Sequence, residues 1–180
     1  MAYKQSITKS GTIRETAGYP TYPSGGVHGG IDTVHTDYKA YAPVAGTVVT
    51  AHIWEGGSTG VDSWGNYIVV SMGGNKYWLA AHFTAQLWNV GDTIAKGDFI
   101  GTQGQSGNVT GTHTHWEYWV GGFGTRYRQD PSTILGIPNG VGTYAVEWDG
   151  GGTPTPPDPP GPPAPGGKLP IWLYFKLTRR

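Results

Sequence analysis

Three short segments carry the side chains whose types and spacing could do chemistry. They read His28-Gly29-Gly30-Ile31-Asp32, Ala80-Ala81-His82 and His113-Thr114-His115. The chain has no cysteine, which excludes disulfides and thiolate metal sites, so a transition metal would be held by imidazole and carboxylate. Two imidazoles and one carboxylate make a three-ligand zinc set with a fourth position for water, which is typical of a catalytic site.

The spacing inside these segments indicates how the side chains converge. In a strand, residues two apart project from the same face, so His113 and His115 would point into one cleft, and Glu117 continues that face as a partner for one of the rings. Two glycines let the backbone bend so that His28 and Asp32 meet. The spacing does not decide which of His113 and His115 binds metal. Histidines left over from ligation would take the proton of a zinc-activated water or stabilise the oxyanion.

The elements that must position these residues are strands. Short apolar, β-branched runs are separated by glycine-containing turns, and no stretch keeps a helical period over ten residues. The sequence Asp130-Pro131-Ser132-Thr133 predicts one short helical turn. We predict an all-β, mainly antiparallel protein with long loops at one end. The clearest strand candidates are Thr47–Ile53, Tyr67–Met72, Tyr77–Ala81 and Phe99–Thr102.

Composition narrows the class of protein. The chain of 180 residues has 12 Lys and Arg against 12 Asp and Glu, and this balance argues against a nucleic-acid partner. No apolar run approaches the ~20 residues that span a bilayer, so no membrane span is expected. The start, MAYKQSITKSG, lacks the apolar core of a signal peptide.

Proline divides the chain. Five of the 14 prolines lie in residues 1–150, and nine lie between Pro154 and Pro170. We therefore expect a catalytic domain over residues 1–136, a Gly/Pro-rich linker over 137–168 and an apolar, basic tip over 169–180. The run Ile171–Phe175 in this tip suggests a contact with another protein, with a membrane interface as the second choice.

In order along the chain, these motifs resemble the lysostaphin-type zinc endopeptidases, which cut peptide cross-links of bacterial peptidoglycan. The resemblance covers roughly residues 20–136 and implies an open, curved antiparallel sheet with a loop-walled groove, of the duplicated hybrid motif or barrel-sandwich hybrid type. It rests on HGGID, YAPVAGTVV, WGNY, the segment from Trp78 to His82, VGDTIAKGDFIG, GTQGQSGNVTGTHTHWE and Asp130-Pro131.

The same resemblance implies roles for individual residues. Zinc would be held by His28, Asp32 and His115, with His113 as the general base. His82 would assist at the oxyanion or the leaving group. Tyr22, six residues before the first histidine, matches a tyrosine that helps to stabilise the transition state in some members.

Two functions follow as hypotheses. The first is a zinc metalloendopeptidase that hydrolyses a cross-bridge or stem-peptide bond of peptidoglycan. Its expected setting is a bacteriophage tail, in the virion or released to the cell wall, with a tail protein bound by residues 169–180. The alternative is a non-catalytic structural tail-tip or wall-binding module with the same fold. His35 and His52 belong to no motif and are expected to be structural.

Overall fold

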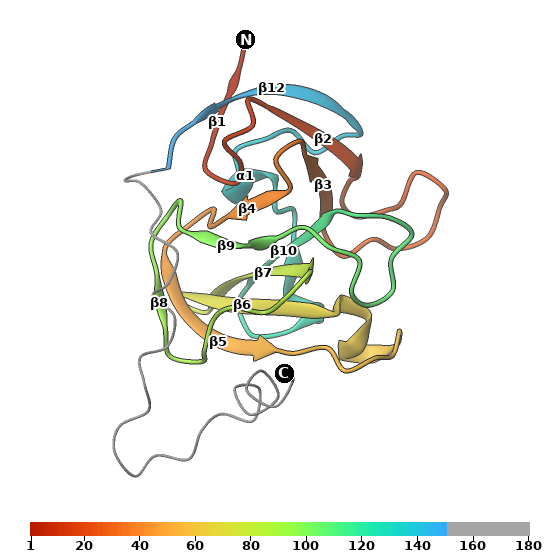
Figure 1. The fold of residues 1–180 in the computed structure, drawn as a ribbon, viewed down its shortest axis with the longest axis vertical. Coiled ribbons are helices and arrows are strands. Elements are labelled where there is room, and N and C mark those ends of the chain that lie inside the picture. Colours follow the sequence, from red (N-terminus) through yellow and green to blue (C-terminus); the bar gives the residue numbers. More distant parts are fainter. Residues whose placement is uncertain (151–180) are drawn as a thin grey trace, which may run out of the picture.

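The computed structural model describes residues 1–150, and the tip with most of the expected linker lies outside the described residues (Figure 1). Strands dominate this part of the chain, with one short α-helix and two 3-10 turns. The strands are β1 (Tyr3–Gln5), β2 (Thr12–Ala17), β3 (Ile31–His35), β4 (Lys39–Tyr41), β5 (Gly46–His52), β6 (Asn66–Gly73), β7 (Lys76–Phe83), β8 (Thr93–Ile94), β9 (Phe99–Thr102), β10 (Thr114–Val120), β11 (Arg128–Gln129) and β12 (Gly142–Trp148). The helix is α1 (Ser132–Leu135), and the turns are η1 (Gly60–Trp64) and η2 (Thr125–Tyr127).

Most strands belong to one open sheet in the order β1-β12-β2-β3-β10-β7-β6-β5-β8, with β11 added beside β10. The pairing is antiparallel except between β1 and β12, which run parallel. The strands β4 and β9 form a second, two-stranded sheet. The prediction of an all-β, mainly antiparallel fold with an open sheet is confirmed. The expected helical turn is also present, as α1.

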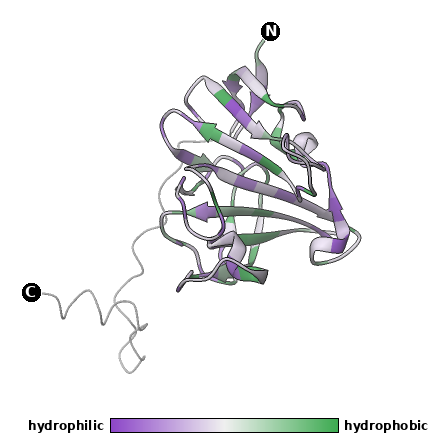
Figure 2. Ribbon diagram, turned by 90° about the vertical axis from the view of Figure 1, so that its right-hand side faces the viewer, coloured by the Kyte–Doolittle hydropathy of each residue, from purple (hydrophilic) through white to green (hydrophobic). Residues whose placement is uncertain are grey.

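Successive side chains of the central strands point to opposite faces of the sheet, and both faces are apolar. On β6 and β7, one face carries Ile68, Val70, Trp78 and Ala80, which pack with the small sheet through Ala40 and Ile100. The other face forms a smaller cluster of Tyr67, Val69, Leu79, Ala81 and Trp119. Figure 2 shows the curved strands in profile, with hydrophobic and hydrophilic residues alternating along them.

The motif residues lie on the face of the smaller cluster. On β10, His115 stands opposite Asp32 of β3 on one side and Ala81 of β7 on the other. Three connecting loops, residues 18–30, 53–65 and 103–113, gather along the same side of the sheet in Figure 1. Adjacent strands thus bring segments far apart in sequence to one place.

One strand lies where we expected the beginning of the linker. Residues 142–148 form β12, which pairs with β2 through Tyr144 and Ile13 and buries Val146 in the larger core. Within residues 1–150, no helix is long and apolar enough to cross a membrane.

Candidate metal centre and active site

Three side chains of the first and third motifs converge at the junction of β3, β10 and the loop before β3. His28 Nε2 lies 3.2 Å from Asp32 Oδ1 and 3.1 Å from His115 Nδ1. His115 Nδ1 lies 2.8 Å from the same Asp32 oxygen. All three residues are buried. The sheet register places Asp32 beside His115, and the preceding loop brings His28 to them.

The opposite nitrogen of each ring is fixed by a hydrogen bond. His28 Nδ1 lies 2.8 Å from the carbonyl oxygen of Gly18, which can only accept, so this nitrogen carries the proton. His115 Nε2 in the same way donates to Glu117 Oε1 at 3.1 Å. Each ring therefore turns its other nitrogen, the one available as a metal ligand, toward Asp32.

The two glycines between His28 and Asp32 are needed for space. A Cβ on Gly30 would lie 1.8 Å from the Trp116 carbonyl oxygen, and one on Gly29 would lie 2.3 Å from the Arg128 guanidinium carbon. Neither glycine has a positive φ. We expected these glycines to let the backbone bend. The structure instead shows that they let strand β10 and Arg128 approach closely.

The charges at this cluster suit a cation. Burial alone would raise the pKa of Asp32, but hydrogen bonds from His115 and His28 hold that pKa far below its usual range, so Asp32 is an anion. Burial likewise disfavours protonated His115, yet the Asp32 and Glu117 carboxylates raise the pKa of His115 to about 9. A positive charge is thus favoured between Asp32 and His115. A metal ion bound there would replace the proton.

The donor set fits zinc. Four-coordinate zinc with bonds of about 2.0–2.1 Å needs ligand atoms about 3.3 Å apart. His28, Asp32 and His115 offer two imidazole nitrogens and one carboxylate oxygen at close to that spacing. These residues could hold a metal ion and would leave a fourth position for water.

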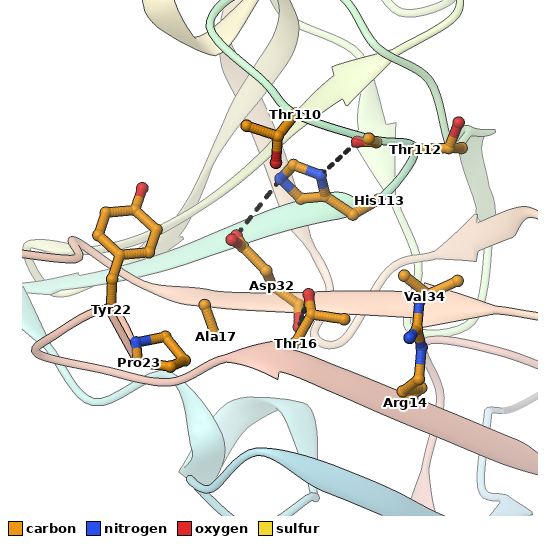
Figure 3. Close-up of a pocket in the computed structure, with 11 residues that line it drawn as sticks. Arg14, Thr16, Ala17, Tyr22, Pro23, Asp32, Val34, Thr110, Thr112 and His113 are labelled. Carbon is orange, nitrogen blue, oxygen red and sulfur yellow. Dashed lines mark hydrogen bonds and ion pairs between the residues drawn. The ribbon is translucent and has the colours of Figure 1, made fainter. Parts of the chain in front are cut away.

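The other two motif histidines lie beside the cluster. His113 Nε2 is 3.6 Å from Asp32 Oδ1, and its Nδ1 donates to the Gly111 carbonyl at 2.8 Å (Figure 3). The ring centroid of His82 lies 4.7 Å from that of His113 and 5.8 Å from that of His115. His82 has a φ of 67°, a left-handed conformation that is uncommon for a residue with a side chain and turns the end of β7.

Both of these histidines have Nδ1 fixed by a backbone carbonyl. His82 Nδ1 donates to the Ser106 carbonyl oxygen at 2.8 Å, as His113 Nδ1 does to Gly111. Burial, together with the nearby rings of His115 and His113, lowers the pKa of His82 to about 3, so the ring is neutral. The neutral His82 ring therefore has a lone pair on Nε2, and in His113 Nε2 is the nitrogen left for proton transfer.

Tyr22 lies at the mouth of the site. Its ring is 4.2 Å from that of His28, 42% of its surface is exposed, and it lines both pockets that flank the cluster. Burial and the Asp32 charge raise the pKa of the Tyr22 hydroxyl, which keeps its proton. This hydroxyl is a neutral donor next to the two acceptor histidines.

Glu117 anchors the far side of His115. It is fully buried and accepts hydrogen bonds from the indoles of Trp64 at 3.2 Å and Trp119 at 2.7 Å. Arg128 donates to both of its oxygens, at 2.7 and 2.6 Å. Burial would raise the pKa of Glu117, but its bonds to His115 and Arg128 lower that pKa to about 2.

Two members of this arrangement were not singled out from the sequence. Arg128 follows the strand of Glu117 by one hairpin, where β11 pairs with β10, and nothing in the sequence distinguishes it from Arg126 in the same hairpin. Ser106 fixes His82 through its carbonyl and holds the backbone of Asn66 through its hydroxyl. The expected contact of Glu117 with a histidine is present.

The remaining histidines lie away from the cluster. His35 is buried in β3, bonded to Thr33 Oγ1 and the Lys39 carbonyl oxygen, and burial lowers its pKa to about 4. His52 lies 3.3 Å from Asp62 Oδ1 and stacks on Tyr67. Neither contributes to the metal cluster.

An open β-sheet with a buried His-Asp-His cluster and two further histidines beside it defines a metal-dependent hydrolase site. The model of peptidase family M23 matches residues 26–129, which include all of these residues. The chain belongs to peptidase family M23.

Known relatives agree with this assignment. Lysostaphin of Staphylococcus staphylolyticus is 29% identical over 131 residues, which cover 66% of this chain and 24% of that protein. Morphogenesis protein 1 of Bacillus phage B103 is 32% identical over 45% of this chain and 22% of its own length. Peptidoglycan DD-endopeptidase ShyC of Vibrio cholerae is 32% identical over 39% of this chain and 15% of its own length.

The fold agrees as well. The catalytic domain of lysostaphin from Staphylococcus simulans superposes with a TM-score of 0.58 at 27% identity, covering 68% of this chain and 92% of that domain. The matched part thus corresponds to a nearly whole catalytic domain, while the chain spans about a quarter or less of the length of these curated relatives.

Proposed function

We propose that this chain is a zinc metalloendopeptidase that hydrolyses peptide bonds of bacterial peptidoglycan. One observation carries the proposal: all four motif histidines have one nitrogen fixed as a donor by a carbonyl or carboxylate partner, which leaves the other nitrogen for one shared site. Two of these nitrogens would join Asp32 as ligands, and two remain for proton transfer. The names of lysostaphin and of the DD-endopeptidase support the substrate.

His28, Asp32 and His115 would hold a zinc ion, which would supply Lewis acidity and lower the pKa of a water to about 7. His113 accepts the proton of the water at Nε2. Tyr22 donates its hydroxyl proton in a hydrogen bond to the developing oxyanion. His82, whose ring centroid lies 4.7 Å from that of His113, can take over the proton that His113 received and pass it to the leaving amine.

Loss of turbidity in a suspension of cell walls, abolished by a chelator and restored by zinc, tests this function. The His113→Ala variant is expected to keep its zinc and lose cleavage, and His115→Ala or Asp32→Ala to lose both. Wild-type metal content in the His115 variant would overturn the ligand assignment. Intact walls after zinc is restored to the wild-type protein would favour a non-catalytic module.

We also propose a phage setting, in which the enzyme is carried on a virion tail and opens the wall of the host. The relative named as a morphogenesis protein of a Bacillus phage supports this setting. Residues 169–180 would bind the tail protein. The test compares localisation and particle assembly of the full chain with a chain that ends at Gly152, and unchanged assembly would overturn the binding role of the tip.

A further inference from the structure

The two pockets that flank the metal cluster differ in charge. One is lined by Tyr22, Trp64, His82, Glu117 and Arg128 among others, and its arginine is bonded to Glu117 at 2.6 Å. The cation and the anion there compensate each other. The second pocket has a volume of about 290 Å³ and lies on the other side, between Asp32 and the loop that carries His113.

Arg14 is the only lysine or arginine among the residues that line this second pocket. The pocket's one carboxylate, Asp32, is already bonded to His28 and His115. Across residues 1–150, no carboxylate lies within 4.0 Å of the Arg14 guanidinium. The Arg14 charge is therefore exposed to the groove without a protein counter-charge.

The sheet fixes the direction of Arg14. Its neighbours Ile13 and Glu15 are buried, with exposed fractions of 0% and 1%, whereas Arg14 is exposed. Because side chains alternate along a strand, Arg14 points away from the core that buries Ile13. Arg14 pairs with Val34, which shares a face of β3 with Asp32. Figure 3 shows Arg14 and Thr16 of β2 beside Val34 and Asp32 of β3, below the loop of Thr110 and His113.

These positions give the approximate distance from the metal cluster to Arg14. Val34 lies two strand positions, or about 7 Å, beyond Asp32. An extended peptide covers about 3.5 Å per residue. A substrate whose scissile bond lies at the cluster would reach the Arg14 guanidinium about two residues along its chain. Thr16, Thr110 and Thr112 also line this pocket.

We propose that Arg14 is a specificity-determining residue that binds a free carboxylate of the substrate about two residues from the scissile bond. The inference rests on the proposed function and narrows its substrate class to wall peptides that carry free carboxylates. A bridge made only of glycine has no side-chain carboxylate to offer at that position. An arginine with no protein partner gains a charge-assisted, bidentate hydrogen bond from such a group.

The test uses the full chain with zinc and two forms of one purified peptidoglycan, either native or with its carboxylates converted to carboxamides by carbodiimide and ammonia. Release of new amino groups is measured for the wild type, for Arg14→Gln and for the control Arg126→Gln. Arg126 is an arginine of η2 that lines neither pocket. Zinc content verifies that each variant is folded and loaded.

The wild type and the Arg126 control are expected to cleave the amidated wall about tenfold more slowly than the native wall, a loss typical of one charge-assisted contact. Arg14→Gln is expected to cleave both walls at about the same rate. Equal wild-type rates on the two walls, or an unchanged preference in Arg14→Gln, would overturn the role of Arg14 and leave the proposed function standing. No release from either wall by the wild type would overturn both.

Discussion

Glu15 of β2 and Glu117 of β10 are buried in the same sheet to nearly the same degree, with exposed fractions of 1% and 0%. Their charge states nevertheless differ. Four side chains donate hydrogen bonds to Glu117, and two of them, His115 and Arg128, lower its pKa to about 2 against the effect of burial. Burial raises the pKa of Glu15 to about 7; the Gly140 backbone N–H opposes this rise, and the Asp130 and Asp32 charges add to it.

The difference shows that partners, more than depth, decide what a buried carboxyl does. In residues 1–150, neither Glu15 oxygen has a hydrogen-bond partner of good geometry, so desolvation dominates. Glu117 has enough donors to remain an anion without solvent, and it can therefore polarise and orient His115. Three substitutions test this contrast.

The largest effect is expected for Glu117→Gln. The substitution leaves Arg128 and two indole N–H groups around a neutral amide, and breaking a buried charged pair in this way costs about 3–5 kcal/mol of unfolding free energy. Loss of the His115 partner is expected to weaken zinc binding about 10- to 100-fold. Urea unfolding and zinc titration measure the two losses.

The matched control for Glu117→Gln is Glu147→Gln on the exposed face of β12, which should change stability by less than about 0.5 kcal/mol. If Glu117→Gln proved as harmless as this control, the donors around Glu117 would not hold a charge.

A smaller effect is expected for Arg128→Met, which removes two charge-assisted bonds and is expected to cost about 2 kcal/mol. A lowered carboxyl pKa stabilises the fold above the unfolded value of 4.5, and this contribution is lost as the pH falls toward 2. Without Arg128 the pKa of Glu117 is higher, so acid unfolding should begin at a higher pH than in the wild type. Circular dichroism from pH 7 to pH 2, with Arg126→Met as control, measures the shift; an acid transition identical to that of wild type would contradict it.

An effect of opposite sign is expected for Glu15→Gln. A carboxyl pKa raised from 4.5 to about 7 costs stability as the pH rises through that interval, because the unfolded chain ionises first. The variant should match wild type near pH 4 and exceed it at pH 8, by at most about 3 kcal/mol. Urea unfolding at both pH values measures this, with Glu55→Gln, an exposed glutamate, as control. A variant less stable than wild type at pH 8 would mean that Glu15 is held as an anion.

Much of this arrangement could be predicted from the sequence. The two-residue spacing placed His115 and Glu117 on one face, and the structure joins them at 3.1 Å. Apolar runs marked the central strands. Local spacing could not reveal the bond between Arg128 and Glu117, because side-chain contacts across a hairpin produce no regular spacing in the sequence. The strand at 142–148 was missed because it follows a Gly- and Pro-containing segment, and its partner β2 lies more than a hundred residues earlier.

The tautomers of the site histidines could not be predicted from the sequence either. Whether a histidine offers Nδ1 or Nε2 depends on which carbonyl meets the other nitrogen, and Gly18, Ser106 and Gly111 each lie in loops whose paths are set by tertiary packing. The same holds for Arg14, whose proposed role rests on the lack of a carboxylate within 4.0 Å of it in residues 1–150 and not on its own spacing.

The parallel pairing of β1 with β12 has a consequence for how this domain can be combined with others. Tyr3 lies opposite Val146 and Gln5 opposite Trp148, so the first and last strands of the described part share one edge of the sheet. In Figure 1 this edge lies apart from the three loops that surround the catalytic residues. Polypeptide joined to either strand would therefore leave from one common edge, and the fold could be fused or inserted as a module with its groove uncovered.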